Sequence, residues 1–276
     1  MLIRVITSVV ALCVLLPFLI FSDTFMMLIL AGVLSVIAEY EMLGCVGWRK
    51  NGWVAIPSYL YGVVFVLLTR VLHGELIFTG LFFLTFAYLF WIMCVSVWSR
   101  GSIDLVEVSV VPMTTAYITF GFASLVLLRD LPHGQYIYLL AFIIPWSCDT
   151  MAYFTGMFFG RHKLIEDVSP KKTVEGAVGG VVLGTGIVLL YGWLVGCFFP
   201  VTPNYPALAV IGVVGTIVSQ FGDLIASKIK RHFGIKDYGV ILPGHGGILD
   251  RFDSNIATAG FLYILCRVLP HLPIFS

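Results

Sequence analysis

Long apolar runs separated by short polar segments dominate this chain from one end to the other. An α-helix needs about 20 apolar residues to cross the hydrocarbon core of a bilayer, which is about 30 Å thick. About nine runs meet this length. The pattern therefore predicts an all-α polytopic membrane protein with about nine transmembrane helices, over residues 3–22, 24–43, 53–72, 77–98, 109–128, 135–159, 176–199, 206–229 and 250–270.

The composition agrees with this pattern. Hydrophobic residues make up 59% of the 276 positions, and the mean hydropathy is +1.01. A water-soluble domain of this length could not bury so much apolar surface, so we expect a lipid bilayer around the chain. The net charge of +1 gives no reason to expect a nucleic-acid partner. The six cysteines show no CxxC or metal-ligand spacing, and we interpret them as small core or lipid-facing residues.

The basic residues are unevenly divided between the two ends of the predicted helices. Lys and Arg collect in the cytoplasmic loops of membrane proteins. Thirteen of the 16 lysines and arginines fall on one side of the predicted topology, and only Arg70, Arg129 and Arg267 fall on the other. This pattern places the N-terminus and both large polar loops in the cytoplasm. Arg4 before an apolar run also resembles a signal peptide, but no small-x-small cleavage site follows it, so we predict an uncleaved first helix.

The two halves of the chain differ in their polar content. We interpret residues 1–130 as a transmembrane scaffold of about five helices, because they are mostly apolar and joined by short turns. Residues 131–276 are interpreted as a catalytic region of about four helices and two cytoplasmic loops. Glu39 and Glu41 are exceptions in the scaffold, at the end of its second predicted helix. We expect both to reach water at the membrane interface; the alternative is a contribution to a polar active cavity at the cytoplasmic side.

Asp149 lies well inside the sixth predicted helix, in the run PWSCDTMAYFTG. An ionised carboxylate in hydrocarbon is costly, so this side chain must face a wet cavity, a cation or a basic partner. We therefore predict a functional role for Asp149, with a structural hydrogen bond between helices as the alternative.

The polar segment between the sixth and seventh predicted helices contains SPKKTVEGAVGG. Pro170 and Thr173 are typical of a helix start, which places Lys171 and Lys172 near a helix N-terminus. Free backbone N–H groups and the helix dipole favour anions there. This arrangement predicts phosphate binding. Positive-inside topology and packing of small residues would separately explain the lysines and the glycines.

Two further groups of polar residues lie at helical spacing. Asp223, Ser227 and Lys230 follow one another four and three residues apart, so they share one helix face. Asp250 and Asp253 are three apart at the start of the last predicted helix. Two such carboxylates repel each other unless a cation lies between them. A bound Mg²⁺ suits these oxygen ligands, and an ion pair with a neighbouring Lys or Arg is the structural alternative.

The segment from Ser227 to Asp253 carries the strongest motif: SKIKRHFGIKDYGVILPGHGGILDRFD. It resembles the signature of the phosphatidate cytidylyltransferase family, also called CDP-diacylglycerol synthases. SPKKTVEG and the segment from Trp146 to Tyr153 also resemble this family, so the likeness covers about residues 140–255. It implies transfer of CMP from CTP to phosphatidic acid, giving CDP-diacylglycerol and pyrophosphate in phospholipid biosynthesis. It also implies a Mg²⁺ requirement, and whether a second cation joins it stays open.

The resemblance and the charge pattern together give each polar residue an expected role. His245 on its own would usually be structural, but it belongs to the glycine-rich loop expected to meet phosphate. The candidate catalytic residues are Asp223, Lys230, Arg231, Asp250, Arg251 and Asp253. The candidate substrate-binding residues are Lys171, Lys172, Thr173, Glu175, Ser227, Lys236, Gly244, His245, Gly246 and Gly247. The candidate metal ligands are Asp223, Asp250 and Asp253, with Asp149 as a fourth.

The same resemblance sets the expected surroundings. Phosphatidic acid would enter sideways from the bilayer, and CTP would come from the cytoplasm to an active site on that face of a bacterial inner membrane. A homodimer is suggested by the family and not by any residue.

Two other function classes share some of these features. A CTP-dependent lipid kinase would use similar residues but transfer the γ-phosphoryl group. An ion-coupled transporter would explain the intramembrane aspartates, but it would more plausibly show two related halves, and we find no internal repeat. A CDP-alcohol phosphatidyltransferase would need a longer aspartate motif than this chain contains.

Overall fold

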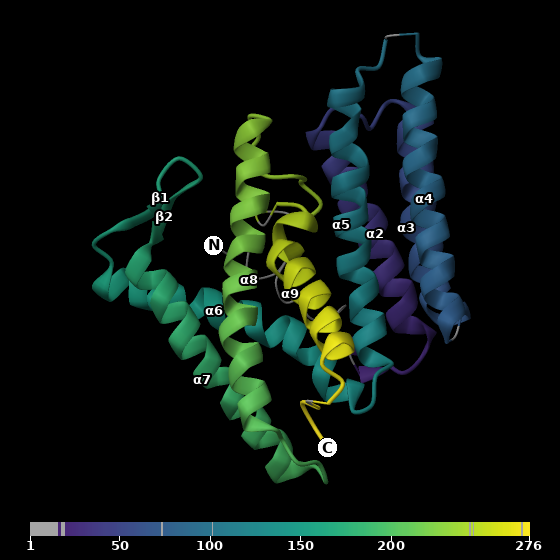
Figure 1. Cartoon of the computed structure of the whole chain (residues 1–276). Coiled ribbons are helices and arrows are strands. Elements are labelled where there is room, and N and C mark those ends of the chain that lie inside the picture. Colours follow the sequence, from purple (N-terminus) through teal and green to yellow (C-terminus); the bar gives the residue numbers. More distant parts are fainter. Residues whose placement is uncertain are drawn as a thin grey trace. The chain divides into compact units, whose positions relative to one another are not determined.

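The computed structural model describes residues 16–17, 20–72, 74–100, 102–242, 244, 246–271 and 273–276, and within them the chain is almost entirely helical (Figure 1). The first predicted helix, over residues 3–22, lies almost wholly outside this part. Eight long helices follow: α2 (Phe25–Cys45), α3 (Gly52–Val71), α4 (Glu75–Trp98), α5 (Leu105–Arg129), α6 (Gly134–Phe159), α7 (Val174–Phe198), α8 (Tyr205–His232) and α9 (Leu249–Val268).

Seven of these helices, α2 to α8, are long and apolar enough to cross a membrane. They fit the predicted polytopic membrane protein. The helix α9 forms close to its predicted position, but it is more polar and is not one of the seven. The number of nine spans and the cytoplasmic N-terminus stay predictions.

Side-chain caps explain where several helices begin. The Thr24 hydroxyl accepts a hydrogen bond from Met26 N (3.2 Å) at the start of α2, and Asn51 Oδ1 accepts one from Trp53 N (3.1 Å) at the start of α3. Asp104 Oδ1 does the same for Val106 N (2.6 Å) before α5. Each cap satisfies an N–H group that the first turn leaves without a partner. These caps therefore determine where each helix begins, which a continuous apolar run does not define.

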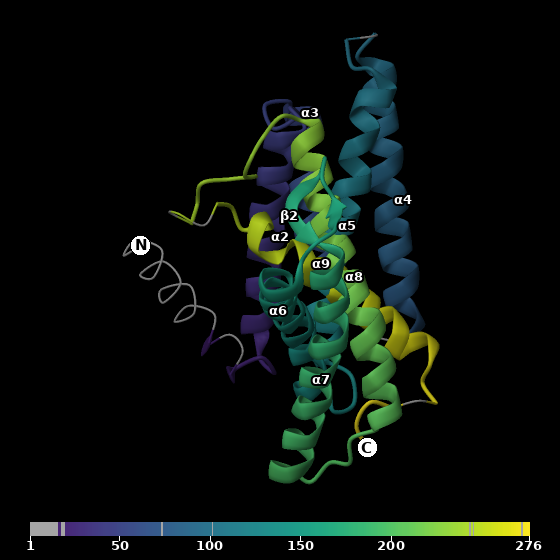
Figure 2. The ribbon, with the colours of Figure 1, turned by 90° about the vertical axis from the view of Figure 1, so that its left-hand side faces the viewer.

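The polar segment before α7 forms a two-stranded antiparallel ribbon and not the expected loop (Figure 2). Strand β1 (Lys163–Ile165) pairs with β2 (Ser169–Thr173), and Lys163 lies opposite Thr173. The Thr173 hydroxyl then caps α7 by accepting a hydrogen bond from Gly176 N (3.1 Å). This short ribbon is the one addition to the predicted all-α class, which the eight helices confirm, and the predicted helix start at Thr173 is confirmed as well.

The described chain forms two compact units. The first contains the described residues up to Val126 together with Phe233–Phe252, and the second contains Leu127–His232 and Asp253–Ser276. The helix α9 therefore begins in the first unit and continues in the second. The predicted division into a scaffold over 1–130 and a catalytic region over 131–276 concerns function and stays a prediction.

Small residues allow close helix packing in the second unit. A Cβ added at Gly180 of α7 would lie 3.0 Å from the carbonyl oxygen of Cys148 on α6, and one at Gly176 would lie 2.8 Å from that of Ala152. Cys148 is fully buried in this contact, as expected for a small core residue. The glycines after the lysine pair therefore serve helix packing.

Candidate active site

Three carboxylates from three helices lie within electrostatic range of one another in the second unit. They belong to Asp149 of α6, Asp223 of α8 and Asp253 of α9. Asp253 is repelled by both of the others, and Asp149 is also repelled by Asp223. We refer to these three residues as the acidic cluster.

The close approach of α8 and α9 positions two members of the acidic cluster. A Cβ added at Gly222, next to Asp223, would lie 3.0 Å from the Asp253 carbonyl oxygen and 2.8 Å from Ala257 Cβ. Because glycine has no side chain, the two helix backbones meet beside the carboxylates. The packing that brings the aspartates together therefore depends on a residue that carries no chemistry itself.

Lys172 of β2 supplies a positive charge to the acidic cluster. Its ammonium forms an ion pair with Asp223 Oδ2 and also attracts the Asp149 carboxylate. The sequence predicted Lys172 as a phosphate ligand, and the structure pairs it with a predicted metal ligand. Its neighbour Lys171 is exposed.

The polar face predicted for α8 is present. The Ser227 hydroxyl donates to Asp223 Oδ1 at 3.5 Å, a long hydrogen bond, and Lys230 attracts the Asp253 carboxylate. Lys230 and Arg231 lie in the last turn of α8, where positive charge is favoured by the helix dipole. This face therefore joins the acidic cluster to the basic end of the helix.

A magnesium ion suits the donor chemistry of the acidic cluster, because Mg²⁺ binds carboxylate oxygens and keeps its remaining positions for water and phosphate. Within the described part of the chain, no three or more His, Cys, Asp or Glu side chains are arranged to hold a metal ion. At Asp223 the cation present is the Lys172 ammonium. The donor atoms of the acidic cluster therefore suit Mg²⁺, but the three carboxylates are not arranged as a metal site in the described part of the chain.

Glu175 and Thr173 are engaged with the backbone around the ribbon. The Glu175 carboxylate accepts hydrogen bonds from Arg161 N (3.1 Å) and His162 N (3.2 Å), and His162 Nδ1 lies 2.6 Å from it. Thr173 caps α7. Both predicted substrate-binding residues thus shape the ribbon that carries Lys171 and Lys172.

The glycine-rich segment lies in the first unit and forms a tight turn. Leu242 pairs with Gly246, and both Gly244 (φ 78°) and Gly246 (φ 86°) adopt positive φ angles that favour glycine. Pro243 and His245 lie outside the described residues. Lys236, also predicted to bind substrate, is exposed in the same unit.

Asp250 holds the glycine-rich segment through hydrogen bonds. Its Oδ2 accepts hydrogen bonds from Tyr238 N (2.8 Å) and Gly247 N (3.0 Å). The N–H of Gly247 was predicted to donate to a substrate phosphate; in this structure it donates to Asp250, and the phosphate contact stays a prediction. Arg251 follows on α9 and is exposed.

Glu39 and Glu41 are buried, with exposed fractions of 0% and 2%, so the prediction that they reach water is wrong. Glu39 Oε1 accepts hydrogen bonds from the hydroxyls of Thr119 (2.7 Å) and Ser35 (3.1 Å). Glu41 accepts from Ile248 N (3.0 Å) and Leu249 N (2.8 Å). Sequence reasoning missed this second contact, and the only signal for it was an acidic residue at the end of an apolar run.

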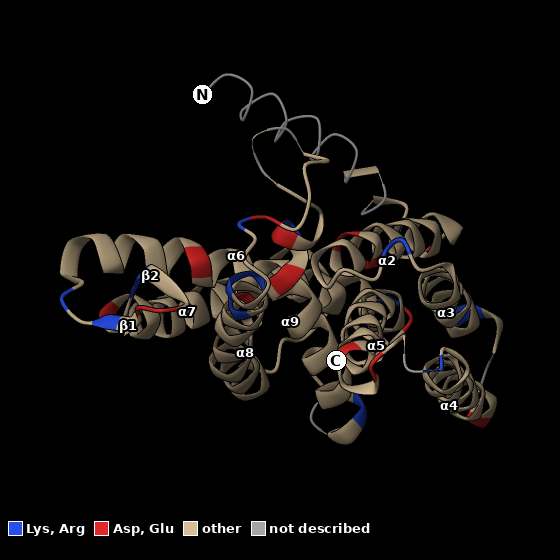
Figure 3. Cartoon of the chain, turned by 90° about the horizontal axis from the view of Figure 1, so that it is seen from above, with Lys and Arg blue, Asp and Glu red and all other residues tan. Residues whose placement is uncertain are grey.

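Charged positions are few in the described chain, as the view coloured by charge makes plain (Figure 3). The predicted residues fall into two groups. The second unit holds Lys171, Lys172, Thr173, Glu175, Ser227, Lys230, Arg231 and the acidic cluster, and the first holds Lys236, Gly244, Gly246, Gly247, Asp250 and Arg251.

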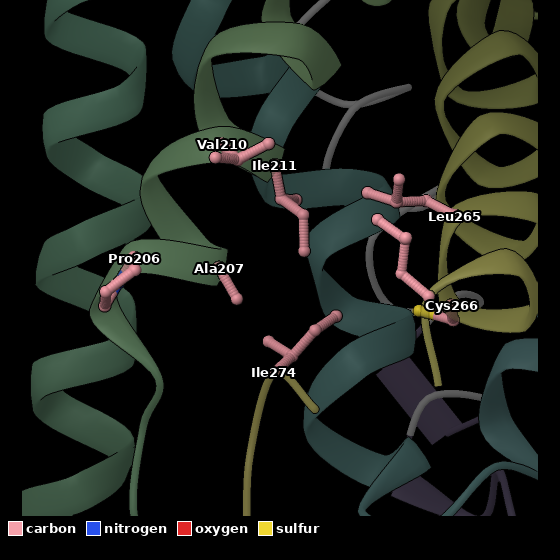
Figure 4. A pocket seen from close by; sticks show the side chains of 8 residues that line it. Pro206, Ala207, Val210, Ile211, Leu265, Cys266 and Ile274 are labelled. Carbon is pink, nitrogen blue, oxygen red and sulfur yellow. The ribbon is translucent and has the colours of Figure 1, made fainter. Parts of the chain in front are cut away.

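A separate pocket of about 130 Å³ in the second unit is apolar (Figure 4). It is lined by residues of α8, α9 and the C-terminal segment, including Ile211, Leu265 and Ile274. None of the predicted site residues lines it, and no charged side chain does. It offers no ligand for a phosphate group.

Comparisons with known proteins agree with the signature between Ser227 and Asp253. A family model described as the cytidylyltransferase family matches residues 2–269. A protein of Staphylococcus haemolyticus named phosphatidate cytidylyltransferase is 33% identical over 266 residues, which cover 95% of this chain and 98% of that relative. Relatives of the same name from Staphylococcus aureus (strain COL) and Staphylococcus epidermidis (strain ATCC 35984) are 34% and 33% identical, with the same two coverages.

Proposed function

The chain belongs to the cytidylyltransferase family, and we infer from this that it transfers CMP from CTP to phosphatidic acid. The products are CDP-diacylglycerol and pyrophosphate, and the reaction serves phospholipid biosynthesis. The observation that carries this conclusion is the match to relatives named phosphatidate cytidylyltransferase over 95% of the chain. The resemblance predicted from the signature is thereby confirmed.

The reaction joins two polyanions. An oxygen of the phosphatidate phosphate attacks the α-phosphorus of CTP, the bond from that phosphorus to the oxygen bridging to the β-phosphate breaks, and pyrophosphate leaves. A phosphate monoester has a second pKa of about 6, so the attacking oxygen is already largely ionised at neutral pH. The protein therefore needs no strong general base. Its main tasks are to reduce repulsion between the phosphates and to hold them in line.

The basic residues of the second unit suit these tasks. Lys172 is already held beside Asp223, and Lys171 precedes it on the same strand. Lys230 and Arg231 end α8. These side chains would neutralise the triphosphate and the lipid phosphate. Lys236 and Arg251 of the first unit are proposed for the same role.

Mg²⁺ is the proposed cofactor, held by Asp223 and Asp253 with Asp149 and Asp250 as further candidates. When bound, the ion would screen the phosphate charges and polarise the phosphorus centre. The mutual repulsion of the acidic cluster supports a cation-binding role, since a cation relieves it. A second cation beside Mg²⁺ is compatible with this proposal.

The protein is a multi-pass membrane protein, as its seven apolar helices indicate. We place the active site at the cytoplasmic face of the bacterial inner membrane, where CTP is available and phosphatidic acid can enter from the bilayer. The homodimer expected from the family also remains part of the proposal.

Product analysis tests this function directly. Purified protein is incubated with labelled CTP, phosphatidic acid and Mg²⁺, and the products are separated. CDP-diacylglycerol and pyrophosphate are expected. CDP and a phosphorylated lipid would instead identify a lipid kinase, and substrate flux in proteoliposomes without CTP would identify a transporter.

A further inference from the structure

Glu41 is a buried carboxylate far along the chain from the signature segment, yet it contacts that segment directly. It lies on α2, and its two oxygens accept hydrogen bonds from Ile248 N (3.0 Å) and Leu249 N (2.8 Å). Leu249 is the first residue of α9. The first N–H groups of a helix have no partner within the helix, and the helix dipole favours a negative charge there. Glu41 thus satisfies the start of α9 from another helix.

Two glycines make room for this carboxylate. A Cβ added at Gly239 would lie 2.3 Å from Glu41 Oε1, and one added at Gly247 would lie 2.4 Å from Glu41 Oε2. Such distances are far too short for real contacts, so any other residue would have to displace the carboxylate. The signature segment is therefore shaped around Glu41 at two points.

Glu41 and Asp250 together hold four backbone N–H groups of the same segment. Asp250 accepts from Tyr238 and Gly247, and Glu41 accepts from the next two residues along the chain. All of these residues belong to the first unit. One carboxylate comes from the segment itself, and the other is supplied by α2.

We propose that Glu41 is a positioning residue for cytidylyl transfer, which fixes the start of α9 and with it Asp250 and the glycine-rich turn. This inference rests on the proposed function. Glu41 does not touch the reacting atoms; it acts through the backbone of residues 248 and 249. A loss of this anchor would misplace groups that must be held closely for reaction, and misplacement of about 1 Å can cost about 100-fold in rate.

The Glu41→Gln substitution isolates the acceptor role. Glutamine has nearly the same shape, but its amide group keeps one acceptor and turns donors toward the other backbone N–H. The matched control is Glu39→Gln. Glu39 is equally buried on the same helix, but it accepts from the Ser35 and Thr119 hydroxyls. A glutamine there keeps an acceptor oxygen for these hydroxyls.

The experiment measures kinetics and hydrogen exchange on the full-length protein in nanodiscs. For Glu41→Gln we expect kcat to fall about 10- to 100-fold with KM for CTP changed less than threefold. Amide exchange in peptides covering residues 238–252 should accelerate by about tenfold, with no change in peptides of α7. Glu39→Gln should leave both quantities near wild type. Unchanged exchange and kcat in Glu41→Gln, or equal losses in both variants, would overturn the proposal.

Gly247→Ala provides a second test of this contact without changing Glu41 itself. Its added methyl group should push on the carboxylate and produce the same pattern of faster exchange and lower kcat. Gly32→Ala on α2 is the control, because a Cβ there meets nothing within 4 Å. Wild-type behaviour of Gly247→Ala would contradict the anchor. If the wild-type protein forms no CDP-diacylglycerol, the proposed function is wrong. The amide hydrogen exchange of residues 238–252 would still test whether Glu41 holds this segment in place.

Discussion

The carboxylates of the two units differ in their partners. In the first unit, Glu41 and Asp250 accept hydrogen bonds from backbone N–H groups. In the second, the members of the acidic cluster repel one another and Asp223 forms an ion pair with Lys172; only Asp253 also accepts a backbone hydrogen bond among the contacts described, from Ser254 N (2.7 Å). Backbone N–H groups are held in place by the fold, so the carboxylates that accept from them have a structural role. A lysine side chain has several rotamers, so we expect that a metal ion can replace the Lys172 ammonium at Asp223.

The largest effect should come from the acidic cluster. Asp223→Asn removes a charge from the proposed cation site, and we expect turnover to fall by about 1,000-fold or more. Asp253→Asn should do the same. Folded protein should still be recovered from the membrane, as gel filtration in detergent can verify.

Asp167→Asn serves as the control, since Asp167 is an exposed residue in the turn between β1 and β2. Near-wild-type turnover in Asp223→Asn would remove Asp223 from the proposed metal site. An equal loss of turnover in Asp167→Asn would show that turnover depends on the overall charge of the protein and not on the acidic cluster in particular.

The next largest effect should come from the exchangeable partner, Lys172. We expect Lys172→Met to lower turnover by about 100-fold, because both the balance of charge at Asp223 and a phosphate ligand are lost. Lys171→Met is the comparison, because its side chain is exposed on the same strand and should cost about tenfold or less. Steady-state kinetics over a range of Mg²⁺ concentrations measures both. Equal losses would assign the two lysines one shared role in phosphate binding.

A change in the packing of α8 against α9 next to the acidic cluster should have a smaller effect on turnover. Gly222→Ala places a methyl group 2.8 Å from Ala257 Cβ, so α8 and α9 must separate beside Asp223 and Asp253. Overpacking of this kind costs about 1–3 kcal/mol. We expect a lower thermal midpoint together with a loss of turnover of about 10-fold. Gly186→Ala, where a Cβ meets nothing within 4 Å, should change neither quantity, and a wild-type Gly222→Ala would contradict the close approach.

Local patterns predicted the helices and one contact between candidate site residues. Apolar runs predicted helices close to all eight that the structure describes, because membrane-length segments are encoded residue by residue. The spacing of Asp223 and Ser227 correctly placed both on one helix face. The ribbon was missed, because KLI and SPKKT show no alternation of apolar and polar residues.

The contacts that the sequence did not predict join distant segments. The ion pair of Lys172 with Asp223 and the hydrogen bonds of Glu41 to Ile248 and Leu249 have no spacing rule, because they depend on how helices pack. Burial itself was misjudged at Glu39 and Glu41 for the same reason. An acidic residue at the end of an apolar run is compatible with the interface and with the interior, and only its partners distinguish the two.

Substitutions at Thr173 should have the smallest effect. They test whether this residue only caps α7 or also binds substrate. Its hydroxyl caps α7, so Thr173→Ala should lower stability by about 1 kcal/mol. Thr173→Asp keeps an acceptor suited to a helix start and should retain stability, but it places a negative charge beside Lys172. If Thr173 also meets substrate phosphate, KM for CTP should rise about tenfold in the aspartate variant, with little change in the thermal midpoint. We expect this rise, because the lysines next to Thr173 are proposed phosphate ligands. An unchanged KM would make Thr173 a cap alone, and the boundary between framework and reactive groups would then fall between residues 172 and 173.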